Sequence, residues 1–462
     1  MLNTVHRYLA LWLTVLAVIA LAAVAQAFAA RAPLAPASGP KAFAQQPTNT
    51  PIFGPIITAP ANATPTPGGA VSPTSTPSPT NTPVPFPTET PLPVGTPLPT
   101  YRADLMGIQV DPAVSAEDFN TTLWLAQRLG VKWLKFQFAW DLLEPQPGQL
   151  SDIFFKYRLF VQQADQQGFS VLISIAKAPD WARASLDEEG PPRDPQDLAN
   201  FITRMMGEVR VDLYGNSYFE AIEVWNEPNL RREWNGGTLS GAEYMRLFDA
   251  AYNGIRAGEG GHSVTIITAG LAPTGINDGV SALDDRAFLR QMYQAGLNNP
   301  AYQNIAIGVH PYGAANPPDA RCCAQPSQGY DDHPTWFFLD TLEDYHAIML
   351  EFGDAGRQLW ATEFGWGTYD GFRTSEGDPA PPPADPLYFQ RIDQASQAHY
   401  ILRAFEIGQS LSYLGPMMLW NLDYAHQDYV DAADPRAAYS LLRGGVNPLR
   451  PAFELLEQSP KE

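Results

Sequence analysis

The feature that most constrains this chain's fold is a series of eight short apolar runs, which begins near residue 105 and continues to residue 422. Amphipathic stretches with helix start signals separate the runs, as in the capping box from Ser240 to Glu243. The runs are Leu105 to Val110, Trp133 to Phe138, Ser170 to Ile175, Ile222 to Trp225, Val264 to Thr268, Ile305 to Val309, Leu359 to Thr362 and Met417 to Leu422. Repeated strand-then-helix units predict an α/β fold, a (β/α)8 barrel, whose functional residues gather at the carboxyl ends of the strands.

Residues 1–30 have the order of an export signal. His6 and Arg7 precede the apolar run from Leu9 to Val24, and the small-residue sequence Ala25-Gln26-Ala27 follows it. We expect cleavage after this signal. The run is also nearly long enough to cross a bilayer, so an uncleaved membrane anchor is the alternative. Either way, the remaining chain is expected to be secreted or tethered to the outer face of the cell membrane.

Residues 31–100 are dominated by Pro, Thr, Ala and Ser and carry almost no charge. A segment of this composition cannot bury a core and favours an extended, polyproline-like chain. We therefore interpret it as a disordered linker. The mixed helix and strand signals of residues 101–462 predict a single folded domain after this linker.

The charge balance argues against a nucleic-acid partner. The chain has 29 Lys and Arg residues against 49 Asp and Glu residues, a formal net charge of −20, whereas phosphate binding needs clustered cations. The histidines lack metal-binding spacing, and the sequence contains no Gly-rich phosphate loop. We expect neither a metal nor an organic cofactor.

The only cysteines, Cys322 and Cys323, are adjacent. Export would permit oxidation to a ring disulfide, although adjacent Cα atoms are only about 3.8 Å apart, below the usual disulfide range. A disulfide and two free thiols are both open alternatives.

Two glutamates stand where an apolar run stops. Glu227 ends the fourth run and is followed directly by Pro228, which breaks the strand, and Glu363 ends the seventh run. A single glutamate at a strand end is as often a solvated or ion-paired residue as a functional one. Two carboxylates facing each other across a barrel mouth are the pair that cleavage of a glycosidic bond requires.

These motifs resemble those of clan A retaining glycoside hydrolases. The string Trp225-Asn226-Glu227-Pro228-Asn229 and the later Thr362-Glu363-Phe364-Gly365 carry the resemblance, which extends from Leu105 to Phe453. Family 39 and its bacterial exopolysaccharide-hydrolase relatives are the most similar in motif. The resemblance implies that Glu227 is the acid/base and Glu363 the nucleophile. It also implies that the residues contacting the sugar include Asn226, His310, Tyr312 and Trp420.

One departure from the family pattern lies on the second run. Many clan members place an Arg near the nucleophile, whereas this chain has Lys135 on the corresponding face. Lys offers a point charge and no planar fork, so the two residues are not equivalent. Lys135 either substitutes as the cation that supports Glu363 or pairs with Glu223 inside the barrel.

Several tryptophans lie near strand ends or in the loops that follow, and indoles commonly stack on sugar rings. We interpret these tryptophans as the lining of a carbohydrate site, with packing in the core as the alternative. They are Trp140, Trp181, Trp234 and Trp366.

The sequence therefore predicts an exported glycosidase that acts on extracellular oligo- or polysaccharide by double displacement. A transglycosylase would use the same two glutamates, because only the acceptor differs. A non-catalytic glycan-binding protein of the cell surface is the alternative outside the enzymes.

Overall fold

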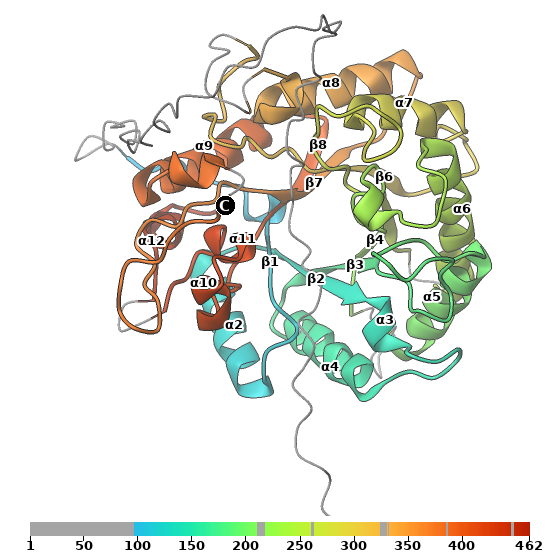
Figure 1. Cartoon of the computed structure of the whole chain (residues 1–462), viewed down its shortest axis with the longest axis horizontal. Helices are drawn as coiled ribbons and strands as arrows, with labels where there is room; N and C mark the ends of the chain where they lie inside the picture. Colours follow the sequence, from blue (N-terminus) through green and yellow to red (C-terminus); the bar gives the residue numbers. More distant parts are fainter. Residues whose placement is uncertain are drawn as a thin grey trace, which may run out of the picture. The chain divides into compact units, whose positions relative to one another are not determined.

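Eight parallel strands close into a barrel in chain order, from β1 to β8 (Figure 1). This computed structural model describes residues 97–209, 218–259, 263–323, 330, 332–384, 387–444 and 448–462. The strands are β1 (Met106–Gln109), β2 (Trp133–Ala139), β3 (Ser170–Ala176), β4 (Ala221–Val224), β5 (Thr265–Thr268), β6 (Ile305–Val309), β7 (Leu359–Phe364) and β8 (Leu414–Leu419). The predicted (β/α)8 barrel is confirmed.

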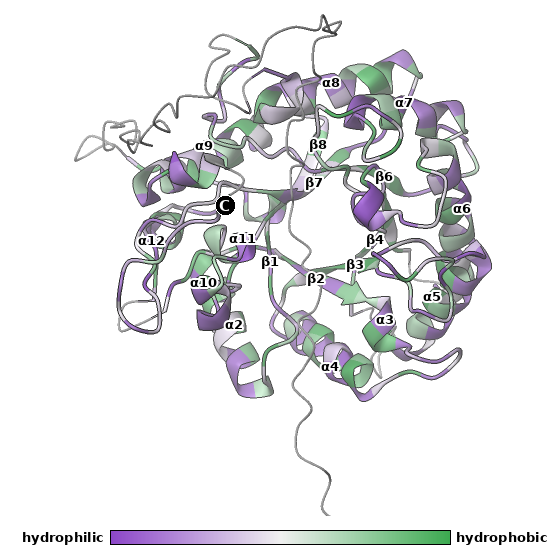
Figure 2. Cartoon of the chain, in the orientation of Figure 1, coloured by the Kyte–Doolittle hydropathy of each residue, from purple (hydrophilic) through white to green (hydrophobic). Residues whose placement is uncertain are grey.

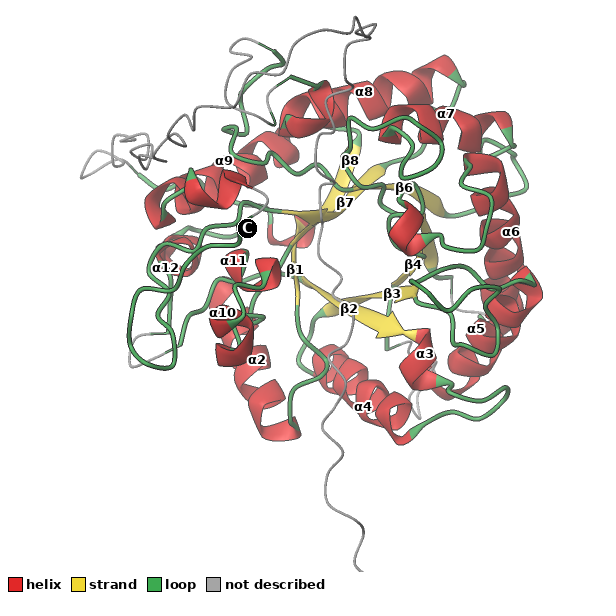
Figure 3. Cartoon of the chain, viewed as in Figure 1, coloured by secondary structure: helices red, strands yellow, loops and turns green. Residues whose placement is uncertain are grey.

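Helices surround the barrel (Figure 3). The larger ones are α2 (Ala116–Leu129), α4 (Asp152–Gln166), α5 (Pro195–Val209), α6 (Gly241–Gly258), α7 (Asp285–Gln294), α8 (Phe338–Glu351), α9 (Gln394–Ser410) and α12 (Pro451–Gln458). Short helices in the connections are α3 (Trp140–Leu143), α10 (Gln427–Asp431) and α11 (Pro435–Ala438), with 3-10 turns η1 (Ala103–Leu105), η2 (Arg231–Glu233), η3 (Pro334–Trp336) and η4 (Leu387–Gln390).

Several helices begin at a side-chain cap that the sequence supplies. The hydroxyl of Ser115 accepts a hydrogen bond from the Asp118 N–H (3.1 Å) before α2, and that of Ser240 accepts one from the Glu243 N–H (3.2 Å) before α6. Hydrophobic and hydrophilic residues alternate along the outer helices (Figure 2). Each helix can therefore bury one face against the barrel and expose the other.

Two apolar regions stabilise the barrel. The larger core packs the outward faces of the strands against the helices. A smaller cluster draws one residue from each of several strands and fills the lower interior of the barrel, so that only the upper interior is left for polar side chains. The members of this cluster are Leu172, Ala221, Ile267, Ala306, Trp360 and Met418, with Trp133 packed against them.

The eighth strand lies three residues earlier than the sequence analysis placed it. We expected a strand from Met417 to Leu422, but β8 begins at Leu414, so the strand includes Gly415 and Pro416. The register between β7 and β8 shifts at this point, and such a bulge accommodates a proline that cannot donate to the ladder. Trp420 consequently follows β8 directly.

Residues 1–96 lie outside the described residues, so the export signal, the membrane anchor and most of the linker remain predictions. Within the described part of the chain, no helix combines the length and the apolar character needed to span a membrane. Tyr101 is joined to the carboxyl end of the chain, because its N–H donates to the Pro460 carbonyl (2.9 Å).

Candidate active site

The backbone after β4 turns sharply and presents Glu227 at the barrel mouth. Trp225 and Glu227 adopt left-handed φ values of 76° and 41°, which non-glycine residues rarely do. The Glu227 N–H donates to the Gly270 carbonyl after β5 (3.1 Å). This bond fixes the turn against the neighbouring strand. Glu363 is the next-to-last residue of β7. Its side chain is 5% exposed, and that of Glu227 is 2% exposed.

The two carboxylates approach each other around His310, which follows β6. One carboxylate oxygen of Glu227, one carboxylate oxygen of Glu363 and one ring nitrogen of His310 all lie within 4.8 Å of one another. His310 Nδ1 is 3.2 Å from Glu227 Oε1 and 3.9 Å from Glu363 Oε2. The predicted pair of glutamates therefore meets at one point.

Lys135 lies beneath the pair and resolves the two alternatives for its role. Its ammonium is 3.0 Å from Glu363 Oε1 and 3.0 Å from Glu223 Oε2, so it supports Glu363 and pairs with Glu223 at once. It also donates to the Thr362 carbonyl (3.0 Å). Burial would lower the pKa of Lys135, but the charges of Glu223 and Glu363 outweigh burial and raise it. The buried ammonium therefore remains charged.

His310 is fully buried between the acidic side chains. Burial alone would lower its pKa, yet the charge of Glu363 and hydrogen bonds to Glu223 and Glu227 raise it to about 9. At neutral pH the ring is an imidazolium. Gly270 makes room for it, because a Cβ at residue 270 would overlap the ring.

Glu227 is held by a cation at each oxygen. His310 contacts Oε1, and Arg232 Nη2 from η2 donates to Oε2 (2.7 Å). Burial would raise the pKa of Glu227, but the His310 hydrogen bond and the charge of Arg232 lower it. Beside them, burial raises the pKa of Glu233 to about 7.

Three side chains complete the surroundings of Glu363. The Tyr312 hydroxyl donates to Oε2 (3.0 Å). With its amide oriented to satisfy its neighbours, Gln109 donates to Glu363 Oε1 (3.3 Å) and accepts from Trp420 Nε1 (3.2 Å). Gln109, at the end of β1, thus connects the nucleophile candidate to the predicted sugar floor.

Asn226 lies beside Glu227 and is 4% exposed. Its Oδ1 is buried and has no hydrogen-bond partner among the described residues. A buried amide oxygen without a partner is costly, and a hydroxyl of a bound sugar would satisfy it.

The cluster of Glu227, His310 and Glu363 has donor atoms close enough for a metal ion. The surrounding charges do not fit one. The carboxylate oxygens of Glu363 accept hydrogen bonds from Lys135 and Tyr312, and Glu227 accepts one from Arg232, so positive charge already surrounds both carboxylates. We assign this site no metal step.

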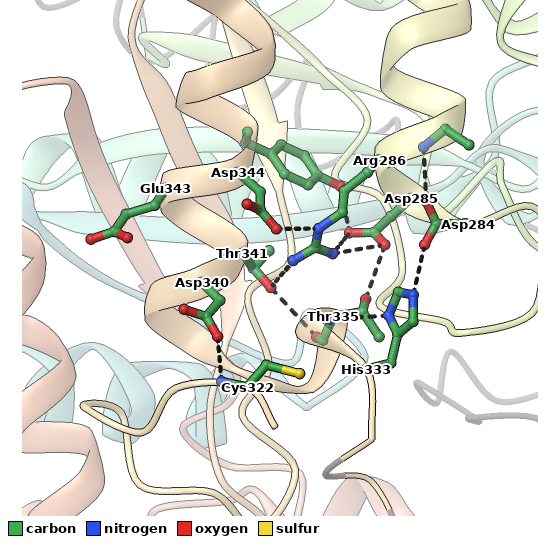
Figure 4. Close-up of polar contacts among 12 residues, drawn as sticks. Asp284, Asp285, Arg286, Cys322, His333, Thr335, Asp340, Thr341, Glu343 and Asp344 are labelled. Carbon is green, nitrogen blue, oxygen red and sulfur yellow. Dashed lines mark hydrogen bonds and ion pairs between the residues drawn. The ribbon is translucent and has the colours of Figure 1, made fainter. Parts of the chain in front are cut away.

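The connection between β6 and α8 is braced by a buried polar network on its outer side (Figure 4). Asp285 is 1% exposed, accepts from the Thr335 hydroxyl (2.9 Å) and pairs with Arg286 (3.1 Å). Earlier in this connection, the Cys322 N–H donates to Asp340 on α8 (2.7 Å). These contacts join the connection to α7 and α8.

Cys322 and Cys323 form a disulfide in the structure. This pairing agrees with the first alternative of the sequence analysis, and the oxidation state of the pair stays a prediction.

Comparison with known proteins places this site in a family. The model of the family described as cellulase (glycosyl hydrolase family 5) matches residues 101–380, more than half of the chain. The chain belongs to glycoside hydrolase family 5. Membership of this family makes the chain a glycosidase, which hydrolyses O-glycosyl compounds. No curated protein matches its sequence.

Solved structures of other glycosidases share the barrel. A family 39 glycoside hydrolase from Bacteroides cellulosilyticus WH2 is 17% identical with a TM-score of 0.53, over 77% of this chain and 63% of that chain. A GH5_18 protein from Bifidobacterium longum subsp. infantis is 14% identical with a TM-score of 0.52, over 78% of both chains. The exo-β-1,4-mannosidase Op5Man5 from Opitutaceae bacterium strain TAV5 is 14% identical with a TM-score of 0.50, over 78% of this chain and 58% of that chain.

These identities support the fold alone. The chain spans less than two thirds of the length of the family 39 and mannosidase structures. The resemblance to clan A glycoside hydrolases is confirmed by the family 5 match, whereas the expected closeness to family 39 is not.

Burial favours the packing alternative for several of the tryptophans named in the sequence analysis. Trp140 is 0% exposed and donates to Glu144 Oε2 (2.8 Å), and Trp366 is 1% exposed and donates to the Asn316 carbonyl (2.9 Å). Both indoles pack among other aromatic rings. Trp234 is likewise buried. Trp140 and Trp366 therefore fit the packing alternative, whereas Trp234 also lines a pocket with Pro191 and Thr238.

Trp181 and Trp420 remain candidates for sugar contact. Trp181 is partly exposed and packs edge-on against Trp140, with its Nε1 donating to the Glu144 carbonyl (3.0 Å). Trp420 is 2% exposed but lies within the group around Glu363.

Sequence reasoning missed Gln109, Arg232 and Glu233. Gln109 lies inside the first apolar run, one residue before its end, whereas the two glutamates follow their runs, so the signal that identified the glutamates does not mark it. Arg232 and Glu233 follow Glu227 closely, but nothing in their spacing indicates that a 3-10 turn folds them back over it.

Proposed function

We propose that this enzyme is a retaining β-glycosidase of extracellular oligo- or polysaccharide, with Glu227 as acid/base and Glu363 as nucleophile. The separation of the two carboxylates carries the proposal. Their oxygens lie within 4.8 Å of each other. Retaining enzymes place their carboxyl groups about 5 to 5.5 Å apart, whereas inverting enzymes need about 6.5 to 9.5 Å to admit a water molecule.

In the first step, a Glu363 oxygen attacks the anomeric carbon while Glu227 donates its proton to the glycosidic oxygen. The glycosidic bond breaks, the leaving sugar departs with that proton, and a covalent glycosyl ester forms on Glu363. In the second step, Glu227 takes a proton from water, whose oxygen attacks the anomeric carbon and releases the sugar and free Glu363.

The charges around the nucleophile support this assignment. Lys135 places a full positive charge 3.0 Å from Glu363 Oε1, and the Tyr312 hydroxyl donates to Oε2 (3.0 Å). Both contacts stabilise the ionised carboxylate before attack and after its release. Asn226, with its unpartnered Oδ1, is positioned beside Glu227 to bind a sugar hydroxyl.

The sugar is a further part of the proposal. The family is named for cellulases, and one structural neighbour is an exo-β-1,4-mannosidase. β-1,4-linked glucans and mannans are therefore the first substrates to test. The order of residues in the first 30, which resembles an export signal, supports action outside the cell.

Azide rescue of alanine variants tests the two roles separately. In Glu363→Ala, azide enters the vacated space and attacks the substrate directly, so we expect a glycosyl azide of inverted configuration. In Glu227→Ala, an aryl substrate with a good leaving group still glycosylates Glu363, and azide then gives a product of retained configuration. NMR of the products distinguishes the two.

Glu243→Ala is the matched control, since this carboxylate pairs with Arg246 on the surface of α6. We expect it to retain wild-type turnover without azide. Retained azide from Glu363→Ala together with inverted azide from Glu227→Ala would reverse the roles.

A further inference from the structure

Two consecutive arginines in η2 are held in different ways. Arg231 donates to three backbone carbonyls, those of Val280 (3.0 Å), Trp234 (3.1 Å) and Gly237 (2.8 Å). Arg232 instead has one short bond, from Nη2 to Glu227 Oε2 (2.7 Å). Its Nε and Nη1 are buried and lack hydrogen-bond partners among the described residues. Arg231 is fixed to the loop by three hydrogen bonds, whereas the one hydrogen bond of the Arg232 side chain to a described residue goes to Glu227.

A second carboxylate lies within reach of Arg232. Glu233 Oε1 is 3.8 Å from Arg232 Nε, and its side chain is 5% exposed. The Trp225 indole donates to the Glu233 carbonyl (3.1 Å) and so fixes this turn beneath the tryptophan. Arg232 therefore lies between two carboxylates and can pair with either after a small rotation.

The bond to Glu227 conflicts with the role of a general acid. In the empty site both oxygens of Glu227 accept from cations, His310 on one side and Arg232 on the other, so the carboxylate is held ionised. A general acid must carry a proton directed at the glycosidic oxygen. One of the two cations has to withdraw before Glu227 can act.

Arg232 is the cation that can withdraw. His310 is completely buried, with its ring packed against Gly270, while the side chain of Arg232 is 21% exposed. The leaving sugar must also approach Glu227, the residue that protonates it, and Arg232 occupies one of that residue's oxygens. Entry of this sugar would displace the guanidinium.

We propose that Arg232 is a positioning residue, which pairs with Glu227 in the empty site and transfers to Glu233 when the leaving sugar enters. This inference rests on the proposed role of Glu227 as acid/base. The enzyme then keeps Glu227 ionised until substrate is bound, and the transfer frees Glu227 to hold its proton.

Other titratable groups besides Arg232 also lie close to the Glu227 carboxyl and influence its pKa. His310 faces it from β6, Glu363 from β7, and the hydroxyls of Tyr312 and Tyr439 lie near enough for their ionisation to respond to Glu227. Lys177, after β3, acts on Glu233. These groups are unchanged when Arg232 alone is replaced.

The first experiment follows the carboxyls directly in the free enzyme. ¹³C NMR titration of protein labelled at glutamate carboxyls, with the Glu227 signal assigned from Glu227→Gln, compares wild type with Arg232→Gln. We expect the Glu227 titration to rise by about one pH unit or more in Arg232→Gln, because a cation within about 4 to 6 Å lowers a carboxyl pKa by about 1 to 3 units. Arg246→Gln, which removes a surface charge from α6, should leave it unchanged.

The second experiment tests the transfer to Glu233 by kinetics on phenyl β-cellobioside and phenyl β-mannobioside. The pH profile of kcat/KM reports the free enzyme and that of kcat reports the complex. In wild type we expect the alkaline limb of kcat at higher pH than that of kcat/KM. Arg232→Gln should move the alkaline limb of kcat/KM up to the pH of the kcat limb. On the alkaline side, kcat/KM of the variant should then exceed that of wild type by about tenfold for each pH unit of this shift. Glu233→Gln should bring the kcat limb down.

An unchanged Glu227 titration in Arg232→Gln would overturn the pairing. Coincident limbs in wild type, or a gap that survives Glu233→Gln, would overturn the transfer. Failure of the proposed function is recognised separately: Glu227→Gln would then hydrolyse the phenyl glycosides as fast as wild type, whatever the NMR titration shows.

Discussion

Lys135 and Glu363 are joined by a 3.0 Å contact beneath the mouth of the barrel, and the same ammonium lies 3.0 Å from Glu223. Lys135 and Glu223 are completely buried. One cation therefore balances a structural carboxylate and the proposed nucleophile together. Removing it would leave two carboxylates without their shared partner, one of them with no access to solvent.

We expect Lys135→Met to lose both stability and activity. Breaking a buried ion pair costs about 3 to 5 kcal/mol, because it leaves an uncompensated charge. Urea unfolding and turnover of an aryl β-glycoside measure the two effects. Lys132→Met is the control: Lys132 is the exposed residue directly before β2 and bonds only the Gly168 carbonyl through its side chain, so the variant should keep its turnover and lose far less stability.

Adding Glu223→Gln to Lys135→Met separates the two roles. The double variant should regain part of the lost stability, because the buried charge is gone, but it should remain inactive, because Glu363 still lacks its cation. Recovery of turnover in the double variant would show that Lys135 serves only Glu223.

Gly270→Ala should impair the site through packing. A Cβ at this residue would overlap the ring of His310 and approach Thr362, so the ring must move away from Glu227. Overpacking of a buried position costs about 1 to 3 kcal/mol. We expect a fall in kcat of at least about tenfold with a lower Tm. Gly356→Ala, at a residue with open space around its Cβ, should behave as wild type.

The positions of the strands could be predicted from the sequence, because a buried parallel strand is a short apolar run that needs little context. The polar side chains of the active site could be predicted only where a sequence motif marks them. Glu227 and Glu363 stop apolar runs, whereas the contact of Arg232 with Glu227 depends on a left-handed turn that no residue type announces. The burial of Trp140 and Trp366 likewise depends on partners distant in sequence, such as Phe201 and Tyr400.

His310 predicts a pH dependence of stability. Its pKa rises from an ordinary value of about 6.5 to about 9 in the folded protein, so folding is favoured by proton binding. This contribution is complete below about pH 6.5 and is lost as pH rises through about 9. As the pH rises from about 6.5 to above 9, the stability lost in this way amounts to about 3 kcal/mol. The free energy of unfolding in urea at several pH values measures it.

His310→Gln removes the titrating ring from the same surroundings. Over the alkaline range the wild type should lose more stability than this variant does. Parallel pH profiles for the two proteins would show that the imidazolium does not contribute.

Tyr312→Phe should reduce activity with little effect on folding. The substitution removes only the hydroxyl that donates to Glu363 Oε2 (3.0 Å), and the ring keeps its place. A hydrogen bond to a charged group contributes about 1.5 to 3 kcal/mol, which predicts about 10-fold to 150-fold lower kcat/KM. Tyr293→Phe removes a comparable hydroxyl, bound to Asp354 away from the site, and should keep full activity. Equal losses in the two variants would indicate a general effect on the fold.

We expect Tyr101 to be needed for folding of the domain. The Tyr101 side chain is 0% exposed, and its hydroxyl donates to the Leu402 carbonyl (3.0 Å). The Tyr101 backbone donates to the Pro460 carbonyl and accepts from the Glu462 N–H. A chain beginning at Pro97 should therefore fold and turn over substrate as the full chain does. A chain beginning at Ala103 loses a buried aromatic residue, which costs about 3 to 5 kcal/mol, together with the bonds to the carboxyl end. Thermal unfolding and specific activity of the two shortened chains provide the measurement, and equal Tm values would place the boundary after Tyr101.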